Sequence, residues 1–267
     1  SGDGIDFDCC PKVATLPRAD CAIAFAGYTG HAYPMMSQLA LAIDAHAPAK
    51  RGSLDIAPLR KHALKVFDAM GGHLRVSSGI TGDIENTPEA TFLFGGYSWI
   101  KKKFRLWSFI YDSGRRSFVG HPAQWIGKAR SHDAIVLRYR KTSLEGAVLG
   151  PIAFAGDQAP TAQNLLAQRL SQMDNFPDSF DLEPFEVIRD MLRDTNHADT
   201  IGGPPQIVKV YQYMKSATLG VYWPDKTSGS PTLHGRPCLP YERIDNWILD
   251  PDTLYSDQRG TQSEIAE

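Results

Sequence analysis

The sequence has little of what metal sites and disulfide frameworks are built from. It holds only four cysteines, Cys9, Cys10, Cys21 and Cys238. They form no CxxC pair and no secreted disulfide pattern, so we interpret them as reduced structural thiols of a cytosolic protein. The eight histidines are scattered without an HxxxH or HExxH motif. The sequence therefore predicts no metal and no other cofactor.

A strong excess of either charge is also absent. The 28 Lys and Arg residues against 30 Asp and Glu residues leave a formal net charge of −2, which favours neither nucleic-acid binding nor disorder. No apolar run reaches the roughly 20 residues of a bilayer-spanning helix, and the opening Ser-Gly-Asp-Gly is not typical of a signal peptide. From these absences we expect a soluble cytoplasmic protein without a nucleic-acid or membrane partner.

Hydrophobic periodicity predicts two series of strands, each followed by a pair of helices, and a closing hairpin. Short apolar or alternating runs mark the strands, and apolar residues at intervals of three and four mark the helices. Strands are expected at residues 12–16, 21–26, 91–94, 104–111, 117–119, 124–127, 134–137, 152–155, 206–211 and 218–222, and helices at 34–47, 56–70, 162–173 and 183–193. This order is neither alternating βαβ nor all-β. It predicts an α+β fold, a four-layer αββα sandwich of two antiparallel sheets between helix pairs.

A few residues mark the ends of these elements. Pro34 suits the first turn of a helix, where its missing N–H has no intrahelical partner to lose. Asp55 is the expected N-cap of the next helix, and glycines at 95–96 are expected to end a strand. The basic run at residues 101–103 falls in a predicted hairpin turn. It fits either a patch for an anionic ligand or a solvated tip.

The length of 267 residues, with 42% hydrophobic residues, is enough to bury one large core or two small ones. We expect one domain over residues 1–223. Residues 224–267 are rich in Pro, Gly, Ser and Asp, and we expect a partly mobile C-terminal extension there. An apolar island at 241–249 is expected to dock on the domain.

Three short sequence blocks carry a resemblance to a known family. They are KVATL with the following AFAG (residues 12–16 and 24–27), FLFGGY (92–97), and AGD with the later IGG (155–157 and 201–203). In this order the chain resembles the proteasome β-subunit and bacterial proteasome-like peptidases, which are N-terminal nucleophile hydrolases with an αββα sandwich. The resemblance covers about residues 8–222, with a longer connection at 113–150.

The resemblance implies two site residues directly. Lys12 matches the lysine whose charge lowers the pKa of the amine or hydroxyl of the nucleophile. Gly27 matches the glycine whose backbone N–H donates to the oxyanion. Taken alone, Lys12 also fits a surface lysine and Gly27 a turn glycine.

Two acidic candidates stand where the chain departs from the family pattern. Asp157 occupies the position of a serine between two glycines, and Ile201 replaces the serine of a Ser-Gly-Gly motif. The nearest acid to that motif, Asp199, is one residue out of register. Either aspartate could orient the hydrogen bonds of the nucleophile. A helix N-cap for Asp157 and a turn role for Asp199 are the alternatives.

The nucleophile itself has no clear place in this sequence. In the family it is the first residue of the mature chain, on a hairpin about thirty positions before the lysine, whereas eleven residues precede Lys12 here. Ser1 offers the α-amine and hydroxyl that the chemistry needs, and eleven extended residues span about 36 Å. We also expect either more chain ahead of Ser1 in the native gene product or another segment in place of the hairpin.

The family implies peptide or amide bond hydrolysis by an N-terminal threonine, serine or cysteine. Its substrates are peptides or proteins, and its members assemble into homo-oligomeric rings or stacks. The alternative is a catalytically silent subunit that serves as a ring or scaffold component, which the lost serines at positions 157 and 201 would suit. A third possibility is an unrelated α+β binding protein.

Overall fold

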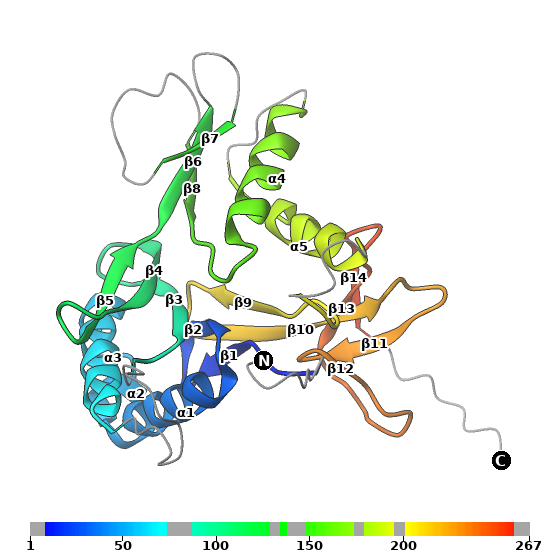
Figure 1. The fold of residues 1–267 in the computed structure, drawn as a ribbon. Helices are drawn as coiled ribbons and strands as arrows, with labels where there is room; N and C mark the ends of the chain where they lie inside the picture. Colours follow the sequence, from blue (N-terminus) through cyan, green and yellow to red (C-terminus); the bar gives the residue numbers. More distant parts are fainter. Residues whose placement is uncertain are drawn as a thin grey trace, which may run out of the picture.

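The computed structural model describes residues 9–73, 87–128, 134–137, 148–173, 179–194 and 201–258. Within these ranges the chain is a mixed α+β protein with five helices and two main sheets, of five and six strands (Figure 1). Three further strands, β6 to β8, form a small sheet of their own. The expected α+β class is therefore confirmed.

The helices are α1 (Thr29–Ala45), α2 (Ala47–Lys50), α3 (Ile56–Gly71), α4 (Ala159–Ser171) and α5 (Glu183–Arg193). The strands of the first half are β1 (Val13–Leu16), β2 (Arg18–Gly27), β3 (Ala90–Ser98), β4 (Lys103–Asp112), β5 (Ser117–Pro122), β6 (Gln124–Lys128) and β7 (Ala134–Leu137). They are followed by β8 (Val148–Ile152), β9 (Ile207–Tyr211), β10 (Lys215–Trp223), β11 (Ser230–Leu233), β12 (Arg236–Pro237), β13 (Trp247–Leu249) and β14 (Ser256–Gln258).

The five-stranded sheet is antiparallel and keeps the order of the chain, from β1 to β5. Its central strand β3 alternates strictly between buried and half-buried residues, because successive side chains point to opposite faces. Phe92 and Phe94 of β3 lie opposite Phe109 and Trp107 of β4. These large rings form the buried face of the sheet.

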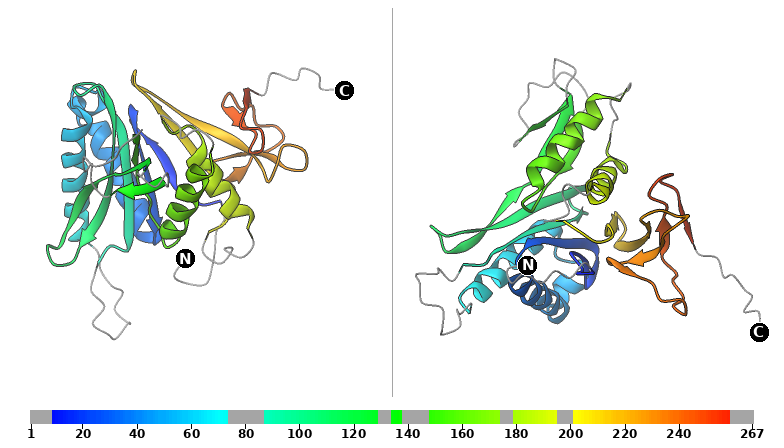
Figure 2. Two further views of the ribbon diagram at one scale, coloured as in Figure 1. Left: turned by 90° about the horizontal axis from the view of Figure 1, so that it is seen from above. Right: turned by 45° about the vertical axis from the view of Figure 1, so that its right-hand side comes forward.

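Helices α1 and α3 cover that face (Figure 2). Phe67 of α3 contacts the rings of Phe92, Phe109 and Phe118, with centroids 4.5 to 6.0 Å apart. Such pairs add about 0.5–1.5 kcal/mol each beyond the burial of their area. The main core of the described chain therefore lies between these two helices and the five-stranded sheet.

The β9–β10 hairpin lies on the other side of the sheet, where it contacts β1 and β2 (Figure 1). Strand β10 then pairs with β11 and, in parallel, with β13. The chain after Pro224 thus adds four strands to the sheet of β10. The expected docking of the island at 241–249 is confirmed by buried Ile248 and Leu249, but the expectation of two wholly antiparallel sheets is wrong.

The second helix pair is also present. Helices α4 and α5 pack on each other, and α4 packs on β7. Their contact is a small apolar cluster, whose buried residues include Leu166, Leu170, Val187 and Met191. Ile188 of α5 is exposed, because Glu183, Val187 and Met191 form the buried stripe of this helix.

The first helix begins earlier than predicted. It starts at Thr29, where the carbonyl of Tyr28 accepts the N–H groups of His31 and Ala32, and Pro34 lies inside it. Only Tyr28 separates the end of β2 from this helix. Similarly, β2 begins at Arg18, three residues before the expected start of its strand at Cys21.

Two predicted strand ends are also wrong. Strand β3 continues through the two glycines at 95–96 to Ser98. Gly96 is required there by a close approach, since a Cβ at this position would lie 2.5 Å from the carbonyl oxygen of Asp20. Strand β8 ends at Ile152, so residues 153–155 are not a strand.

None of the helices in the described ranges is long and apolar enough to cross a membrane.

Candidate functional site

Three of the five predicted site residues lie in described parts of the chain. Lys12, Gly27 and Asp157 are all close to the end of β2, although they are far apart in the sequence. Ser1 and Asp199 lie outside the described residues.

Gly27 is the last residue of β2 and adopts a positive φ of 102°. A Cβ at this position would lie 2.5 Å from the carbonyl oxygen of Glu89, which no side chain can tolerate. The same carbonyl accepts the N–H of Tyr28 at 2.7 Å. The bend that leads from β2 into α1 therefore requires glycine.

The N–H of Gly27 points away from β3. The N–H groups along a strand alternate between its two neighbours. That of Phe25 donates to Lys12 on the β1 side, and that of Tyr28 donates to Glu89 on the β3 side. The N–H of Gly27 is thus directed to the β1 side, beyond the first residue of β1, where an oxyanion could approach it.

Lys12 immediately precedes β1 and is half-buried. Its carbonyl accepts the N–H of Phe25 at 3.0 Å, and its own N–H donates to Oε1 of Gln206 at 2.7 Å. Its Nζ lies 4.4 Å from the centroid of the Phe25 ring, a cation–π contact. The backbone of Lys12 is held in place by these two hydrogen bonds, and its charge lies against the Phe25 ring.

Gln206, just before β9, joins this segment to the second sheet. Its amide oxygen accepts the N–H groups of Lys12 and Val13, and its Nε2 donates to the carbonyl of Cys10 at 2.8 Å. No feature of the sequence pointed to Gln206. A lone glutamine 194 positions from its partner carries no periodic signal that could have revealed it.

Tyr33 of α1 also anchors the approach to β1. Its hydroxyl donates to the carbonyl of Pro11 at 3.0 Å and lies 3.2 Å from the thiol of Cys10. Burial, together with the contact to Cys10, raises the pKa of Tyr33, so its hydroxyl remains a protonated donor. Its ring contacts that of Phe25 edge-on at 5.5 Å. The sequence analysis assigned no role to this tyrosine.

Asp157 reaches the end of β2 through its neighbour Gly156. Gly156 has a φ of 106°, and a Cβ on it would lie 3.4 Å from the Cβ of Ala26. Asp157 itself is exposed, and its carboxylate accepts the N–H of Gln158 at 3.0 Å. The N-cap of α4 is Gln158, so Asp157 does not take the N-cap position that was its alternative role.

Lys12 and Gly156, the residue before Asp157, lie at the end of β2 on opposite faces of the sheet. Lys12 is the cross-strand neighbour of Phe25, whose side chain is buried beneath α1. Gly156 contacts Ala26, whose side chain points to the other face because neighbouring residues alternate. The N–H of Gly27 lies between them, in the plane of the sheet.

One histidine lies at the same end of the sheet. Nδ1 of His31 accepts the N–H of Glu89 at 3.1 Å, and its ring contacts Tyr28 edge-on. The proton of the neutral ring is therefore on Nε2. This imidazole is a further polar group near Gly27 that no feature of the sequence singled out.

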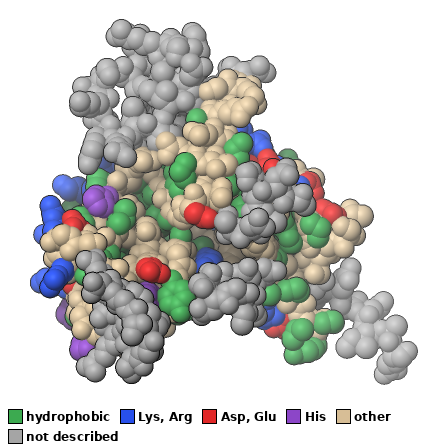
Figure 3. Space-filling view, in the orientation of Figure 1, with side chains coloured by type: hydrophobic (Ala, Val, Ile, Leu, Met, Phe, Trp, Pro, Cys, Tyr) green, Lys and Arg blue, Asp and Glu red, His purple; other side chains and the backbone are tan. Residues whose placement is uncertain are grey.

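In the described ranges, no cluster of three or more His, Cys, Asp or Glu side chains could hold a metal ion. The face in Figure 3 mixes apolar, acidic and basic side chains over its described area, with basic ones gathered at the left edge. The site is thus defined by backbone geometry and by a few polar side chains.

Comparison with known proteins gives no further guide, since no family model and none of the curated proteins matches this chain.

Proposed function

We propose that the chain is an N-terminal nucleophile hydrolase of the proteasome-like type, which hydrolyses peptide or amide bonds. The observation that carries the proposal is the meeting of Lys12, the N–H of Gly27 and the Gly156–Asp157 loop at the end of β2. These positions were selected by resemblance alone. Their proximity is what a shared site requires.

The proposed fold is the four-layer αββα sandwich. Helices α1 and α3 form one outer layer and the five-stranded sheet the next. The β9–β10 hairpin, on the far side of that sheet, belongs to the second β layer. In this proposal α4 and α5 provide the second outer layer.

In the proposed reaction an N-terminal hydroxyl or thiol attacks the carbonyl carbon of the substrate, and its proton passes to the free α-amine. The carbonyl oxygen becomes an oxyanion and accepts the N–H of Gly27, a contact worth about 3 kcal/mol in such sites. Collapse of the intermediate breaks the C–N bond. The leaving amine takes the proton, and an acyl-enzyme remains, which water hydrolyses by the same steps in return.

Lys12 has the role of tuning the nucleophile in this proposal. Its flexible stem allows Nζ to leave the Phe25 ring. Within about 4–6 Å of the N-terminal amine, its charge would lower the pKa of that amine. Asp157 would orient a polar group of the substrate or nucleophile from the other face. Ser1 is the candidate nucleophile within this sequence.

A peptide epoxyketone or β-lactone tests the proposal directly. We expect covalent labelling of one N-terminal residue, identified by peptide mass spectrometry. Lys12→Met should slow labelling and hydrolysis by about 100-fold, while Lys61→Met on the exposed face of α3 should leave both unchanged. Labelling of Ser1, or of a residue preceding it in a longer form of the chain, would assign the nucleophile. Absence of any labelled residue in the folded protein contradicts the hydrolase proposal.

A second candidate is a catalytically silent ring or scaffold subunit. Two observations support it. The Asp157 carboxylate is engaged by its own loop, and Ile201 packs on the apolar cluster of α4 and α5 rather than offering a hydroxyl. Native mass spectrometry and electron microscopy would then find ring-shaped or stacked homo-oligomers, with no labelling by the inhibitors. A monomer that is not labelled contradicts both candidates.

A further inference from the structure

The end of the molecule opposite Gly27 carries two hairpin turns. Because Gly27 pairs with Ala90, the turn after β3 lies at the other end of the ladder, beside Arg18. The turn between β9 and β10 lies at that end too, since the thioether of Met214 rests directly on Gly52, next to α2. Figure 2 (left) shows both turns on the same side. We call residues 99–104 and 211–215 together the tip face.

The tip face presents large apolar side chains to solvent. Trp99 and Ile100 are 51% and 56% exposed, and Tyr213 is 82% exposed. Phe104 and Met214 are also exposed. Isolated exposed apolar residues are common on proteins, but a group of them on two turns at the same end of the molecule is typical of an interaction surface.

The β3–β4 turn is held in this arrangement by its own hydrogen bonds. The hydroxyl of Ser98 donates to the buried carboxylate of Asp55 at 2.8 Å and accepts the N–H of Lys101 at 3.0 Å. The ring of Phe104 contacts that of Tyr97 at 5.2 Å. The turn is therefore anchored to the start of α3, and its apolar side chains are left outside the core.

The loop between α2 and α3, on which Met214 packs, is anchored as well. The guanidinium of buried Arg18 donates to the carbonyls of Ala49 and Leu54, on either side of Gly52. Gly52, on which Met214 packs, is therefore held at a fixed position relative to Asp55. The two turns thus form one preorganised surface.

The charge of the tip face is positive. Its two segments contain Lys101, Lys102, Lys103 and Lys215 and no acidic residue. Lys209 adds a fifth cation, since the Nζ atoms of Lys209 and Lys215 lie 5.5 and 5.7 Å from the ring centroid of Tyr211. The net charge of −2 for the whole chain conceals this local excess.

We propose that the tip face docks on anionic phospholipid membranes. Tryptophan and tyrosine favour the boundary between headgroups and acyl chains, and each lysine near an anionic leaflet adds to the attraction. The aliphatic side chain of Ile100 can enter the boundary, whereas it could not stack on nucleic-acid bases. Protruding turns also suit a flat surface better than an extended peptide. This proposal departs from the expectation of no membrane partner, which rested on the lack of an apolar run long enough to span a bilayer.

Vesicle sedimentation tests the charge dependence. The wild-type protein should bind vesicles with about one third phosphatidylserine and not those of phosphatidylcholine alone, and high salt should release it. Lys102→Glu with Lys103→Glu should weaken binding about tenfold or more. Arg115→Glu with Arg116→Glu is the matched control, because it makes the same charge change in the β4–β5 turn and also includes a residue at positive φ. Equal binding by the two double variants overturns the proposal.

Quenching by brominated lipids tests the orientation. Trp99 and Trp247 are equally exposed, at 51% and 49%, but Trp247 lies on β13, away from the tip face. Quenching should be largely lost in Trp99→Phe and retained in Trp247→Phe. The reverse result overturns the proposal. So does binding to single-stranded DNA or an acidic protein without vesicle binding, or a self-association that only Trp99→Phe abolishes.

Discussion

The two helix pairs of this protein are held by different forces. Helices α1 and α3 lie on the five-stranded sheet over a large aromatic and aliphatic core. Helices α4 and α5 share only a small apolar cluster, and charged side chains make up much of their remaining contact. Apolar burial contributes about 25 cal/mol per Å², whereas exposed ion pairs contribute about 0–1 kcal/mol each. The first pair is therefore the stable part of the fold.

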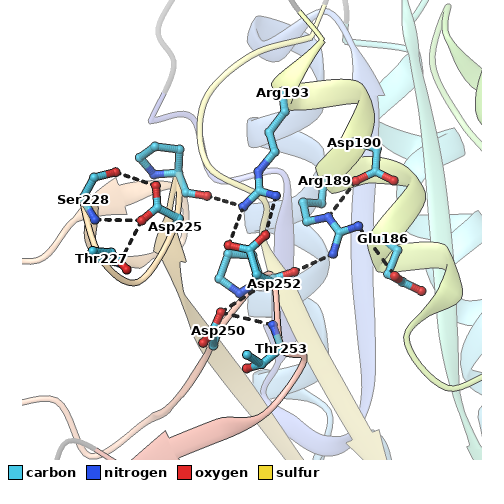
Figure 4. A network of polar contacts seen from close by, with 12 residues as sticks. Glu186, Arg189, Asp190, Arg193, Asp225, Thr227, Ser228, Asp250, Asp252 and Thr253 are labelled. Carbon is cyan, nitrogen blue, oxygen red and sulfur yellow. Dashed lines mark hydrogen bonds and ion pairs between the residues drawn. The ribbon is translucent and has the colours of Figure 1, made fainter.

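The charged contacts of α5 extend to the C-terminal strands (Figure 4). Arg189 donates to the carbonyl of Pro251, and Arg193 donates to the carboxylate of Asp252 at 2.7 Å and to the carbonyl of Pro224. Arg169 of α4 binds Glu186 and Asp190. The second helix pair thus serves as a polar connection between the end of the chain and the rest of the molecule.

The largest expected loss of stability comes from emptying the aromatic core beneath α1 and α3. Phe67→Ala should lower the free energy of unfolding by about 3–5 kcal/mol, because it removes a ring that three others contact. Urea unfolding measures this loss. Leu41→Ala, at an exposed position of α1, should change stability by no more than about 0.5 kcal/mol. A small effect of Phe67→Ala would show that the core between α1, α3 and the sheet is not the main stabilising region.

A matched pair of leucines compares the two helix layers directly. Leu59 of α3 and Leu166 of α4 are both fully buried. Leu59→Ala should cost about 3–5 kcal/mol, and Leu166→Ala nearer to 2 kcal/mol, since the smaller cluster can collapse around the cavity. The same urea experiment measures both. A larger loss for Leu166→Ala would mean that α4 and α5, and not α1 and α3, form the more stable part of the fold.

The polar connection should respond to Arg193→Met with a smaller change. Loss of the contacts to Asp252 and Pro224 should cost about 1 kcal/mol. Amide hydrogen exchange in β13 should also become faster, and added salt should reduce the difference from wild type. Arg116→Met, in an exposed turn, is the control. Unchanged exchange in β13 would mean that strand pairing alone holds the C-terminal strands.

The smallest expected effect is a difference in how the stability of the two helix pairs depends on pH. Burial lowers the pKa of His62 on α3, and the neighbouring His46 and Lys65 lower it further. As pH falls, His62 therefore becomes protonated in the unfolded chain before it does in the folded protein. His62 thus makes the fold less stable as pH falls below about 6.5. His62→Asn should remove this slope, which pH-dependent urea unfolding measures. A slope that is unchanged in His62→Asn contradicts the assignment.

In the second pair the titrating group is Asp190. Burial raises its pKa, but the hydrogen bonds from Arg189 and Arg169 outweigh burial and lower it overall. Its stabilising contribution is therefore present above the ordinary pKa of about 3.9 and lost as pH falls below it. Acid should thus affect α1 and α3 at mild pH and α4 and α5 only at strongly acidic pH.

Local pattern was enough to predict most elements. Helix α3 begins and ends close to the predicted positions because its apolar spacing and terminal residues agree, whereas α5 keeps its predicted bounds but buries other residues. The predicted Asp55 N-cap has the right position but another role, since its carboxylate accepts the hydroxyl of Ser98 rather than a backbone N–H. Strand β13 was recognisable only as an apolar island, because three residues are too few for a period.

The candidate site was predictable only in part. Resemblance selected Lys12, Gly27 and Asp157, whereas Gln206 and Tyr33 carry no signal in the sequence. Their contacts with the segment before β1 depend on strands and helices that meet in space. No local sequence pattern indicates a contact between segments so far apart in the chain.

By itself, the sequence determined the α+β class, the order of the elements and the glycine at position 27, because periodicity and backbone conformation are local properties. Only the tertiary structure decided that Gly156 meets Ala26, that Gln206 holds Lys12, and that the residues after Pro224 complete the sheet of β10. It also decided which apolar side chains remain outside the core, as Trp99 and Ile100 do. Burial depends on which surfaces meet, and distant parts of the chain provide those surfaces.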